Sequence, residues 1–497
     1  MPPLLPANAS TTLKKFHSTG NPILADGSIY SADPAPLVVN GTVYILSGRD
    51  EAGPIENAFI MNEWQVFEAQ KPDAAGGDWL LHRDIARPHE VFLWADEGYA
   101  YAGQIVQAAN GKFYLYAPVM QSNTTSDDPF GIGVAVSDSP LGPFIDAHPS
   151  GPIISQSVPA PGNNIQNIDP TVLIDTDGRV FIYFGTFGQL RGYELEQGMM
   201  TIKGSVVTVK TLTGFFEAPW LMKRKNDYYM LYAANNAGAD SPCTPTSYHA
   251  CLAYGTASSP LGPWSFQGVF MGIVSSTTSH PGVYERDGEW FLVYHTRDAE
   301  GGTHFRRSIA FDKLRWDDST NPPSIIRVVQ THRPSKPRQP SRNIAPLAKA
   351  SSNIQTPIQY WIAALNDERV DAAPLPPDYW SSYAAEQLPQ NVTLTYTWNS
   401  TVQLNGVKMV FFADQDAGSN IGVPPPKEWK VEYLDVSKWK AVEAGVYPVQ
   451  VADKPKEVRF TTVETTAIRA VLTASGGDGQ FGGIGVKEWE ALAPKAV

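Results

Sequence analysis

The chain has 497 residues, of which 42% are hydrophobic and 11% aromatic, and a formal charge of −12 at pH 7. This length indicates two or three domains, and the acidic balance disfavours nucleic acid and anionic membranes as partners, because both attract basic patches. The sequence contains no apolar run of about 18 residues, the length needed to span a bilayer. Its 41 Gly and 41 Pro favour short strands with tight turns. We therefore expect an all-β protein with a neutral or cationic ligand.

Residues 1–20 are polar and rich in Pro, and we expect a loosely held N-terminal lead-in. The start MPPLLPANAS lacks the charged beginning and apolar core of a signal peptide, so the protein is either cytosolic or already processed. Secretion is favoured by Cys243 and Cys251, which are close enough to close a small loop as a disulfide. It is also favoured by five N-glycosylation sequons, at Asn8, Asn40, Asn123, Asn391 and Asn399.

One strand–turn–strand unit recurs five times between residues 21 and 330. In four copies a polar residue precedes a turn and a following aromatic strand: Asp33 before Asn40-Gly41, Asp169 before Asp177-Gly178, Glu217 before Asn226-Asp227, and His280 before Asp287-Gly288. The fifth copy has Tyr101 and Gln104 ahead of Asn110-Gly111. Copies spaced by about 49 to 70 residues suit four-stranded propeller blades that carry insertions.

The first strand of each propeller blade lines the central channel, so equivalent positions of different blades converge. Asp33, Asp169, Glu217 and His280 are therefore predicted to meet in one pocket. Three acids there suggest glycoside hydrolysis, which needs one protonated carboxyl and one ionised carboxylate. Glu217 follows Phe215 and Phe216, and an acid with apolar walls is a candidate proton donor.

The remaining candidates are aromatic and basic side chains. Trp94, Phe215 and Phe216 offer flat faces for sugar rings, and Arg307 could hydrogen-bond sugar hydroxyls. Each has a structural alternative: Trp94 could be ordinary blade packing, and an Asp before Pro is usually a turn residue when it stands alone. His280 could be a core histidine or could hold a water or cation on the axis.

At these residues the chain resembles glycoside hydrolase family 43, over about residues 21–330. The resemblance implies a five-bladed propeller and an inverting mechanism, with Asp33 as general base, Glu217 as general acid and Asp169 setting the pKa of the acid. It also implies no cofactor for the chemistry, an axial calcium or water site near His280, and Arg307 near the sugar. The matching motifs are Ser31-Ala32-Asp33-Pro34, Asn167-Ile168-Asp169-Pro170-Thr171, Phe216-Glu217-Ala218-Pro219-Trp220, Ser279-His280-Pro281-Gly282-Val283 and Arg306-Arg307-Ser308.

Residues 331–350 are basic and rich in Pro, and are predicted to be an interdomain linker. Residues 351–497 alternate apolar and polar side chains between turn signals, which predicts a β-sandwich accessory domain of the jelly-roll kind. This part resembles a discoidin-like sandwich, in which an exposed aromatic such as Trp361 or Tyr379 could bind glycan. The expected strands are Val392–Trp398, Gly406–Ala413, Trp429–Leu434, Glu457–Thr462 and Ala467–Thr473.

The family resemblance implies a plant cell-wall polysaccharide, arabinoxylan or arabinan, as the partner. We expect a monomeric, secreted, inverting α-L-arabinofuranosidase that removes side chains from arabinoxylan, including those on doubly substituted xylose. A β-xylosidase or an exo-α-1,5-arabinanase on the same scaffold is an alternative, and a non-catalytic glycan-binding lectin is another. The segment Asn57–Asp96 and the Cys243–Cys251 loop are the insertions expected to shape the pocket rim.

Overall fold

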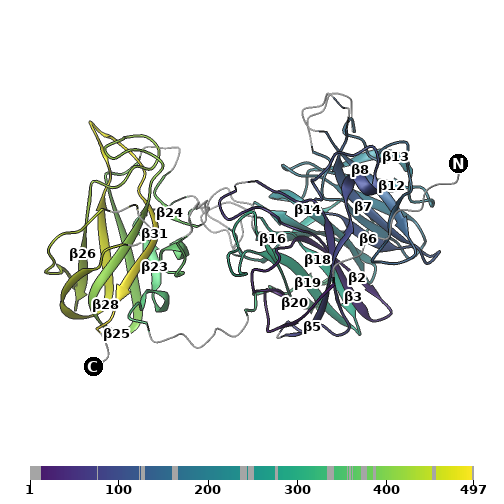
Figure 1. Cartoon of the computed structure of the whole chain (residues 1–497). Coiled ribbons are helices and arrows are strands. Elements are labelled where there is room, and N and C mark those ends of the chain that lie inside the picture. The colour runs from purple at the N-terminus through teal and green to yellow at the C-terminus, as the bar shows by residue number, and fades with distance from the viewer. Residues whose placement is uncertain are drawn as a thin grey trace. The chain divides into compact units, whose positions relative to one another are not determined.

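The computed structural model (Figure 1) divides the chain into two compact units, residues 1–334 and 335–497. It describes residues 13–494 except 57, 75, 123, 125–128, 159–165, 236–242, 244–250, 275–277, 333–340, 355, 357–359, 361, 371–377, 384–387, 450 and 452–454. The sequons at Asn8 and Asn123, and Trp361, lie outside the described residues.

The first unit is a ring of five antiparallel sheets, and these form the five blades of a β-propeller. Blade 1 has the order β1-β5-β4-β3-β2, with β1 (Leu13–Ser18), β2 (Ala32–Val39), β3 (Thr42–Gly48), β4 (Trp64–Ala69) and β5 (Gly77–Ala86). The short helix α1 (Pro88–Val91) leads to blade 2, which contains β6 (Gln104–Gln107), β7 (Phe113–Met120), β8 (Phe130–Ser137) and β9 (Ile145–Asp146).

The other three blades follow the same meander. Blade 3 contains β10 (Thr171–Ile174), β11 (Val180–Phe184), β12 (Leu190–Leu195) and β13 (Ile202–Val209). Blade 4 contains β14 (Phe215–Arg224), β15 (Asp227–Ala234), β16 (Cys251–Ala257) and β17 (Ser265–Met271). Blade 5 contains β18 (Gly282–Arg286), β19 (Glu289–Thr296) and β20 (Ser308–Leu314), and the small pair β21 (Trp316–Asp317) and β22 (Ser324–Ile325) follows it.

The inner strands close a complete circle, since β2 contacts β6, β6 contacts β10, β10 contacts β14, β14 contacts β18 and β18 contacts β2. The second strand of each blade is the aromatic run of the sequence repeat, and it is buried over most of its length. The core therefore lies between neighbouring blades, and the polar residues of the repeat are carried to the axis. The predicted five-bladed propeller is confirmed.

Residues 21–23, which precede β2, complete blade 5. The backbone N–H of Ile23 donates to the carbonyl of Ile309 on β20 at 2.8 Å. The side chain of Asn21 donates to the carbonyl of Phe311 at 2.8 Å and accepts the Phe311 N–H at 3.0 Å. These bonds lay the segment before β2 along the outer edge of β20, in the place of a fourth strand.

Part of the predicted N-terminal lead-in is ordered. Residues 13–18 form β1, which pairs antiparallel with β5. The ring of Phe16 meets the ring of Phe67 edge-on, with 6.2 Å between the ring centres. This apolar contact and the backbone pairing with β5 explain why the polar stretch forms a strand rather than a loose segment.

The second unit is built on an antiparallel sheet with the order β24-β31-β25-β28-β26-β27, to which β23 adds by pairing with β25. Its core contains Trp380, Trp429 and Trp489. Its main elements are η1 (Ala345–Leu347), β23 (Lys349–Ser352), η2 (Ile362–Leu365), β24 (Trp380–Ser381), β25 (Asn391–Phe412), β26 (Glu428–Asp435), β27 (Lys438–Ala441), β28 (Val458–Thr473), β29 (Gly476–Gly477), β30 (Gln480–Phe481) and β31 (Gly485–Leu492).

Two expectations for this region differ from the structure. Residues 341–350 were predicted to belong to the linker, yet Arg342 bonds the carbonyl of Ala493 at 2.8 Å and β23 joins the sheet, so they are part of the second unit. Four expected strands merge into the two long strands β25 and β28. Register shifts, such as the one between Thr397 and Val402, bend the pair without ending it.

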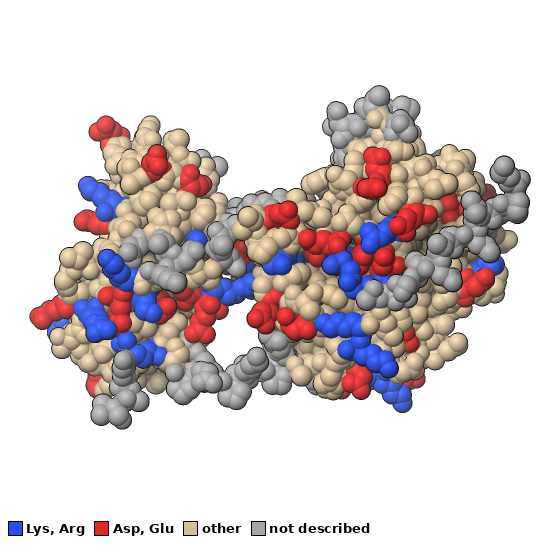
Figure 2. Space-filling model, in the orientation of Figure 1, with Lys and Arg blue, Asp and Glu red and all other residues tan. Residues whose placement is uncertain are grey.

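On the face shown in Figure 2, acidic and basic side chains are interspersed and do not form one basic patch. Within the described part of the chain, no helix has the length and apolar character needed to cross a membrane.

Candidate active site

A cavity of about 520 Å³ lies where the inner strands of the propeller meet. Six predicted site residues line it: Asp33, Asp169, Phe216, Glu217, His280 and Arg307. They come from blades 1, 3, 4 and 5, so the ring brings together residues that are far apart in the sequence.

Unusual backbone geometry determines the direction of the acidic side chains. Asp33 and Asp169 have φ of 57° and 58°, and Ala218, which follows Glu217, has φ of 56°. Register shifts interrupt the pairing of β2 with β3 between Ala32 and Ala35, and the pairing of β14 with β15 on both sides of Glu217. Left-handed residues at such irregularities turn one side chain out of the sheet, and they often mark functional sites.

Asp33 lies among cationic and potentially cationic groups. Its Oδ1 is 2.9 Å from Nη1 of Arg307, 3.3 Å from Nδ1 of His295 and 3.7 Å from Nδ1 of His280. Burial alone would raise the pKa of Asp33, but the charge of Arg307 and then the hydrogen bond with His295 lower this pKa far below its usual range. Asp33 is therefore ionised throughout the ordinary pH range.

Arg307 is held by a second acid, Asp50, at the end of β3. The backbone N–H, Nε and Nη2 of Arg307 donate to the Asp50 carboxylate at 2.8, 2.9 and 2.9 Å. Nη1 is left to donate to Asp33. Nothing in the sequence repeat places Asp50 in register with the other acids, so the repeat gave no signal for this contact.

Glu217 and Asp169 form the other side of the cluster. Thr186 Oγ1 donates to Oε2 of Glu217 at 2.9 Å, and the Ala218 N–H donates to Oδ2 of Asp169 at 3.0 Å. Burial and the negative charge of Asp33 raise the pKa of Glu217 to about 7, although the Thr186 hydrogen bond lowers it. Burial, then the charges of Glu217 and Asp33, also raise the pKa of Asp169 well above its usual value. The site thus contains one carboxylate kept ionised and two carboxyls that favour protonation.

His280 lies in the cavity, but its surroundings do not fit a calcium ion held by side chains. Burial lowers the pKa of His280 to about 4, so its ring is neutral. Calcium prefers six to eight oxygen ligands, whereas the carboxylate beside His280 is already bonded to Arg307. The described residues contain no group of three or more His, Cys, Asp or Glu side chains arranged to hold a metal.

Two predicted aromatic contacts lie elsewhere. The indole of Trp94 packs on Phe92 and donates from Nε1 to Asp146 at 3.0 Å. Phe215 packs against Tyr232. Neither residue lines the cavity, so the structure places both where blade packing, rather than sugar stacking, accounts for them.

Beside the predicted Phe216, other aromatic residues line the cavity: Phe59, Tyr99, Tyr101, Phe130 and Phe187. Phe59 and Tyr99 lie in loops between strands, where the repeat gave no signal. The segment Asn57–Asp96, expected as a rim insertion, contains strands β4 and β5 of blade 1, and only Phe59 and Met61 from it line the cavity. Cys243 and Cys251 form a disulfide, while residues 244–250 between them lie outside the described residues.

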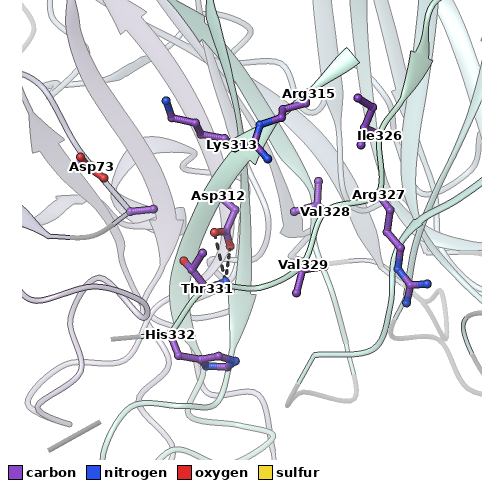
Figure 3. Close-up of a pocket in the computed structure, with 11 residues that line it drawn as sticks. Asp73, Asp312, Lys313, Arg315, Ile326, Arg327, Val328, Val329, Thr331 and His332 are labelled. Carbon is purple, nitrogen blue, oxygen red and sulfur yellow. Dashed lines mark hydrogen bonds between the residues drawn. The ribbon is translucent and has the colours of Figure 1, made fainter. Parts of the chain in front are cut away.

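A separate cavity of about 490 Å³, drawn in Figure 3, lies beside β20. Its one buried acid, Asp312, accepts hydrogen bonds from Tyr294 and from the backbone of Thr331. Lys313 and Arg327 extend in opposite directions there (Figure 3), so their charges do not converge on a common ligand position. The axial cavity is therefore the better candidate for an active site.

Comparisons with known proteins identify a family and several relatives. The family model described as Glycosyl hydrolases family 43 matches residues 19–321. A xylosidase/arabinosidase of Bacteroides ovatus is 30% identical over 332 residues, which cover 58% of this chain and 92% of that protein. An arabinoxylan arabinofuranohydrolase of Bacillus subtilis strain 168 is 30% identical over 335 residues, which cover 59% of this chain and 60% of that protein.

A likeness in structure extends over both units. The crystal structure of a family 43 arabinoxylan arabinofuranohydrolase from Bacillus subtilis, in complex with cellotetraose, matches with a TM-score of 0.50 and 19% identity. The match covers 96% of this chain and 98% of that one. At this identity it shows that the two chains share a fold.

Proposed function

Because the chain belongs to glycosyl hydrolase family 43, we propose that it removes α-L-arabinofuranosyl side chains from arabinoxylan, with inversion at the anomeric carbon. The observation that supports hydrolysis is that one acid of the cavity is ionised while another favours the protonated form. Arg307 keeps Asp33 ionised, whereas burial raises the pKa of Glu217 to about 7. One base and one acid are the two groups that acetal cleavage by inversion requires.

In the proposed mechanism, Glu217 gives its proton to the glycosidic oxygen as the bond from that oxygen to the anomeric carbon breaks. A water molecule attacks the opposite face of the sugar, and Asp33 accepts a proton from this water as the new carbon–oxygen bond forms. Asp169, whose carboxylate is fixed by the Ala218 N–H, adds negative charge beside Glu217 whenever it is ionised and so favours the protonated acid. Arg307 keeps the base ionised and in place.

The choice of arabinoxylan is supported by relatives named for that activity, in Bacillus subtilis and in Paenibacillus polymyxa at 28% identity. The Bacteroides ovatus relative is named for both xylosidase and arabinosidase activity, which keeps β-xylosidase as the second candidate. The raised pKa of Glu217 opposes the lectin alternative, because a binding protein has no use for a protonated acid beside an ionised one.

The proposal includes a secreted, N-glycosylated monomer that acts on plant cell-wall polysaccharide. Three sequon residues, Asn40, Asn391 and Asn399, are exposed and open to a glycosyltransferase. The disulfide between Cys243 and Cys251 suits an oxidising compartment.

Proton NMR of the products released from arabinoxylan tests the function. We expect the branch arabinofuranosyl signals to disappear and the arabinose first released to have the anomeric configuration opposite to that of the bond. Release of xylose from xylo-oligosaccharides without release of arabinose would favour the second candidate. Retention of configuration would contradict the roles of Asp33 and Glu217.

A further inference from the structure

The turn between β11 and β12 has an unexpected residue at its tip. The N–H of Gln189 donates to the carbonyl of Thr186 at 3.0 Å, which leaves Phe187 and Gly188 as a two-residue hairpin loop. Their φ angles are 51° and 79°, the positive pair of a type I′ turn. Asn, Asp or Gly is strongly preferred at the first position of such a turn, because other side chains are strained there.

Other two-residue hairpins of the chain in which both loop residues have a positive φ follow that preference. Asn40-Gly41 joins β2 to β3 with φ of 50° and 80°, and Asp287-Gly288 joins β18 to β19 with φ of 55° and 81°. Phe187 therefore departs from the residues that this protein uses in these type I′ turns. Lys225 and Val436, with φ of 54° each, also begin two-residue hairpins, but the second residue of those loops does not have a positive φ. A strained aromatic that is not needed for the turn is a candidate for function.

Phe187 is not needed for the core either. It is 60% exposed, although a large apolar side chain normally gains from burial. Its ring lies edge-on to Phe216 at 5.7 Å, and both rings line the axial cavity. An exposed aromatic face beside a reaction site is suited to stacking on a sugar ring.

The turn is attached to the general acid at two points. Thr186, which precedes Phe187, donates to Glu217, and the N–H of Gly188 donates to the carbonyl of Phe216 at 3.0 Å. In the proposed mechanism Glu217 protonates the leaving oxygen. The groups beside it therefore face the part of the substrate that departs, which in a polymer is the main chain.

We propose that Phe187 is a stacking platform for the sugar that carries the departing oxygen and that it makes the enzyme selective for polymeric substrates. Tyr99, from blade 2, is a second such platform. It also has a positive φ, of 57°, is 39% exposed and lies edge-on to Phe130 at the cavity. The inference rests on the proposed function, because it assigns the leaving-group side from the role of Glu217.

The decisive variant is Phe187→Asn, since Asn suits the turn better than Phe does. We expect its melting temperature to equal or exceed that of the wild type, while the ratio of kcat/KM for arabinoxylan to kcat/KM for methyl α-L-arabinofuranoside falls about tenfold. The methyl glycoside has no ring on its leaving group to stack. Phe187→Tyr should restore the ratio, and Ile145→Ala, which removes an exposed apolar side chain from β9, should not change it.

A ratio that stays at the wild-type value in Phe187→Asn overturns the proposal. If the wild type releases no arabinose from either substrate, the proposed function fails and the platform is tested by binding alone. In that case the Glu217→Gln protein is run through gels that contain soluble xylan or arabinan. Retardation that is lost on adding Phe187→Asn supports the platform, whereas equal retardation, or none, refutes it.

Discussion

The guanidinium of Arg307 donates one hydrogen bond to Asp33 at 2.9 Å, while its Nε and Nη2 and the backbone N–H of the same residue donate to Asp50. Asp50 thereby fixes the cation, and the cation keeps the proposed base ionised. This network of two buried acids and one arginine keeps Asp33 ionised across the ordinary pH range. The predictions below follow from that fixed charge.

Arg307→Lys should lower kcat/KM about 10- to 100-fold and should bring an acidic limb into the measurable pH range. A lysine cannot bond both carboxylates in the fixed geometry of the guanidinium, so the pKa of Asp33 should rise. The pH profile of kcat/KM checks this. Arg306→Lys, in which the neighbouring cation above the ring of Tyr30 is changed, is the matched control and should keep the wild-type profile.

The wild-type enzyme should lose activity on the alkaline side, with a limb near pH 7, because Glu217 must be protonated and its pKa is raised to about 7. Glu217→Gln should lower kcat on arabinoxylan by about 10²- to 10⁴-fold and should lack this limb. An activated leaving group that needs no proton should recover part of the rate. An unchanged alkaline limb in the variant would assign the titration to another group.

Thr186→Val should move the alkaline limb upward in pH. The hydroxyl of Thr186 donates to Glu217 and lowers its pKa, so its loss leaves burial and the charge of Asp33 to raise that pKa further. Thr176→Val, which removes a hydroxyl bonded to Asp175 and Lys223 away from the cavity, should leave the limb in place. A downward shift in Thr186→Val contradicts the assignment of the acid.

The same carboxyl should affect stability. Because the folded pKa of Glu217 is raised above its unfolded value, its favourable contribution is complete below about pH 4 and is lost as the pH rises toward 7. Glu217→Gln should therefore gain stability relative to the wild type between these values, on the order of 1–3 kcal/mol. Denaturant unfolding at pH 4.5 and pH 8 measures the difference, and equal differences at both pH values would rule out the raised pKa.

The repeat predicted the ring and the gathering of Asp33, Asp169, Glu217 and His280, because equivalent positions of successive blades must face one axis. It could not predict Asp50, which holds Arg307, or His295, which lies beside Asp33, because neither occupies a repeated position. Phe187 did have a signal, since Phe-Gly stands where other hairpins of the chain have Asn-Gly or Asp-Gly. Trp94 was predicted to contact sugar but packs within its blade, because the sequence does not reveal which way an aromatic ring points.

The pairing of residues 21–23 with β20 also determines when the propeller can form. Asn21 and Phe311 are separated by 290 positions, so a growing chain has an open ring until blade 5 has been synthesised. Closing so long a loop is entropically costly and slow. Until residues 21–23 pair with β20, the edge of β20 is open to pairing with other chains, so this contact limits the time in which the last blade can aggregate.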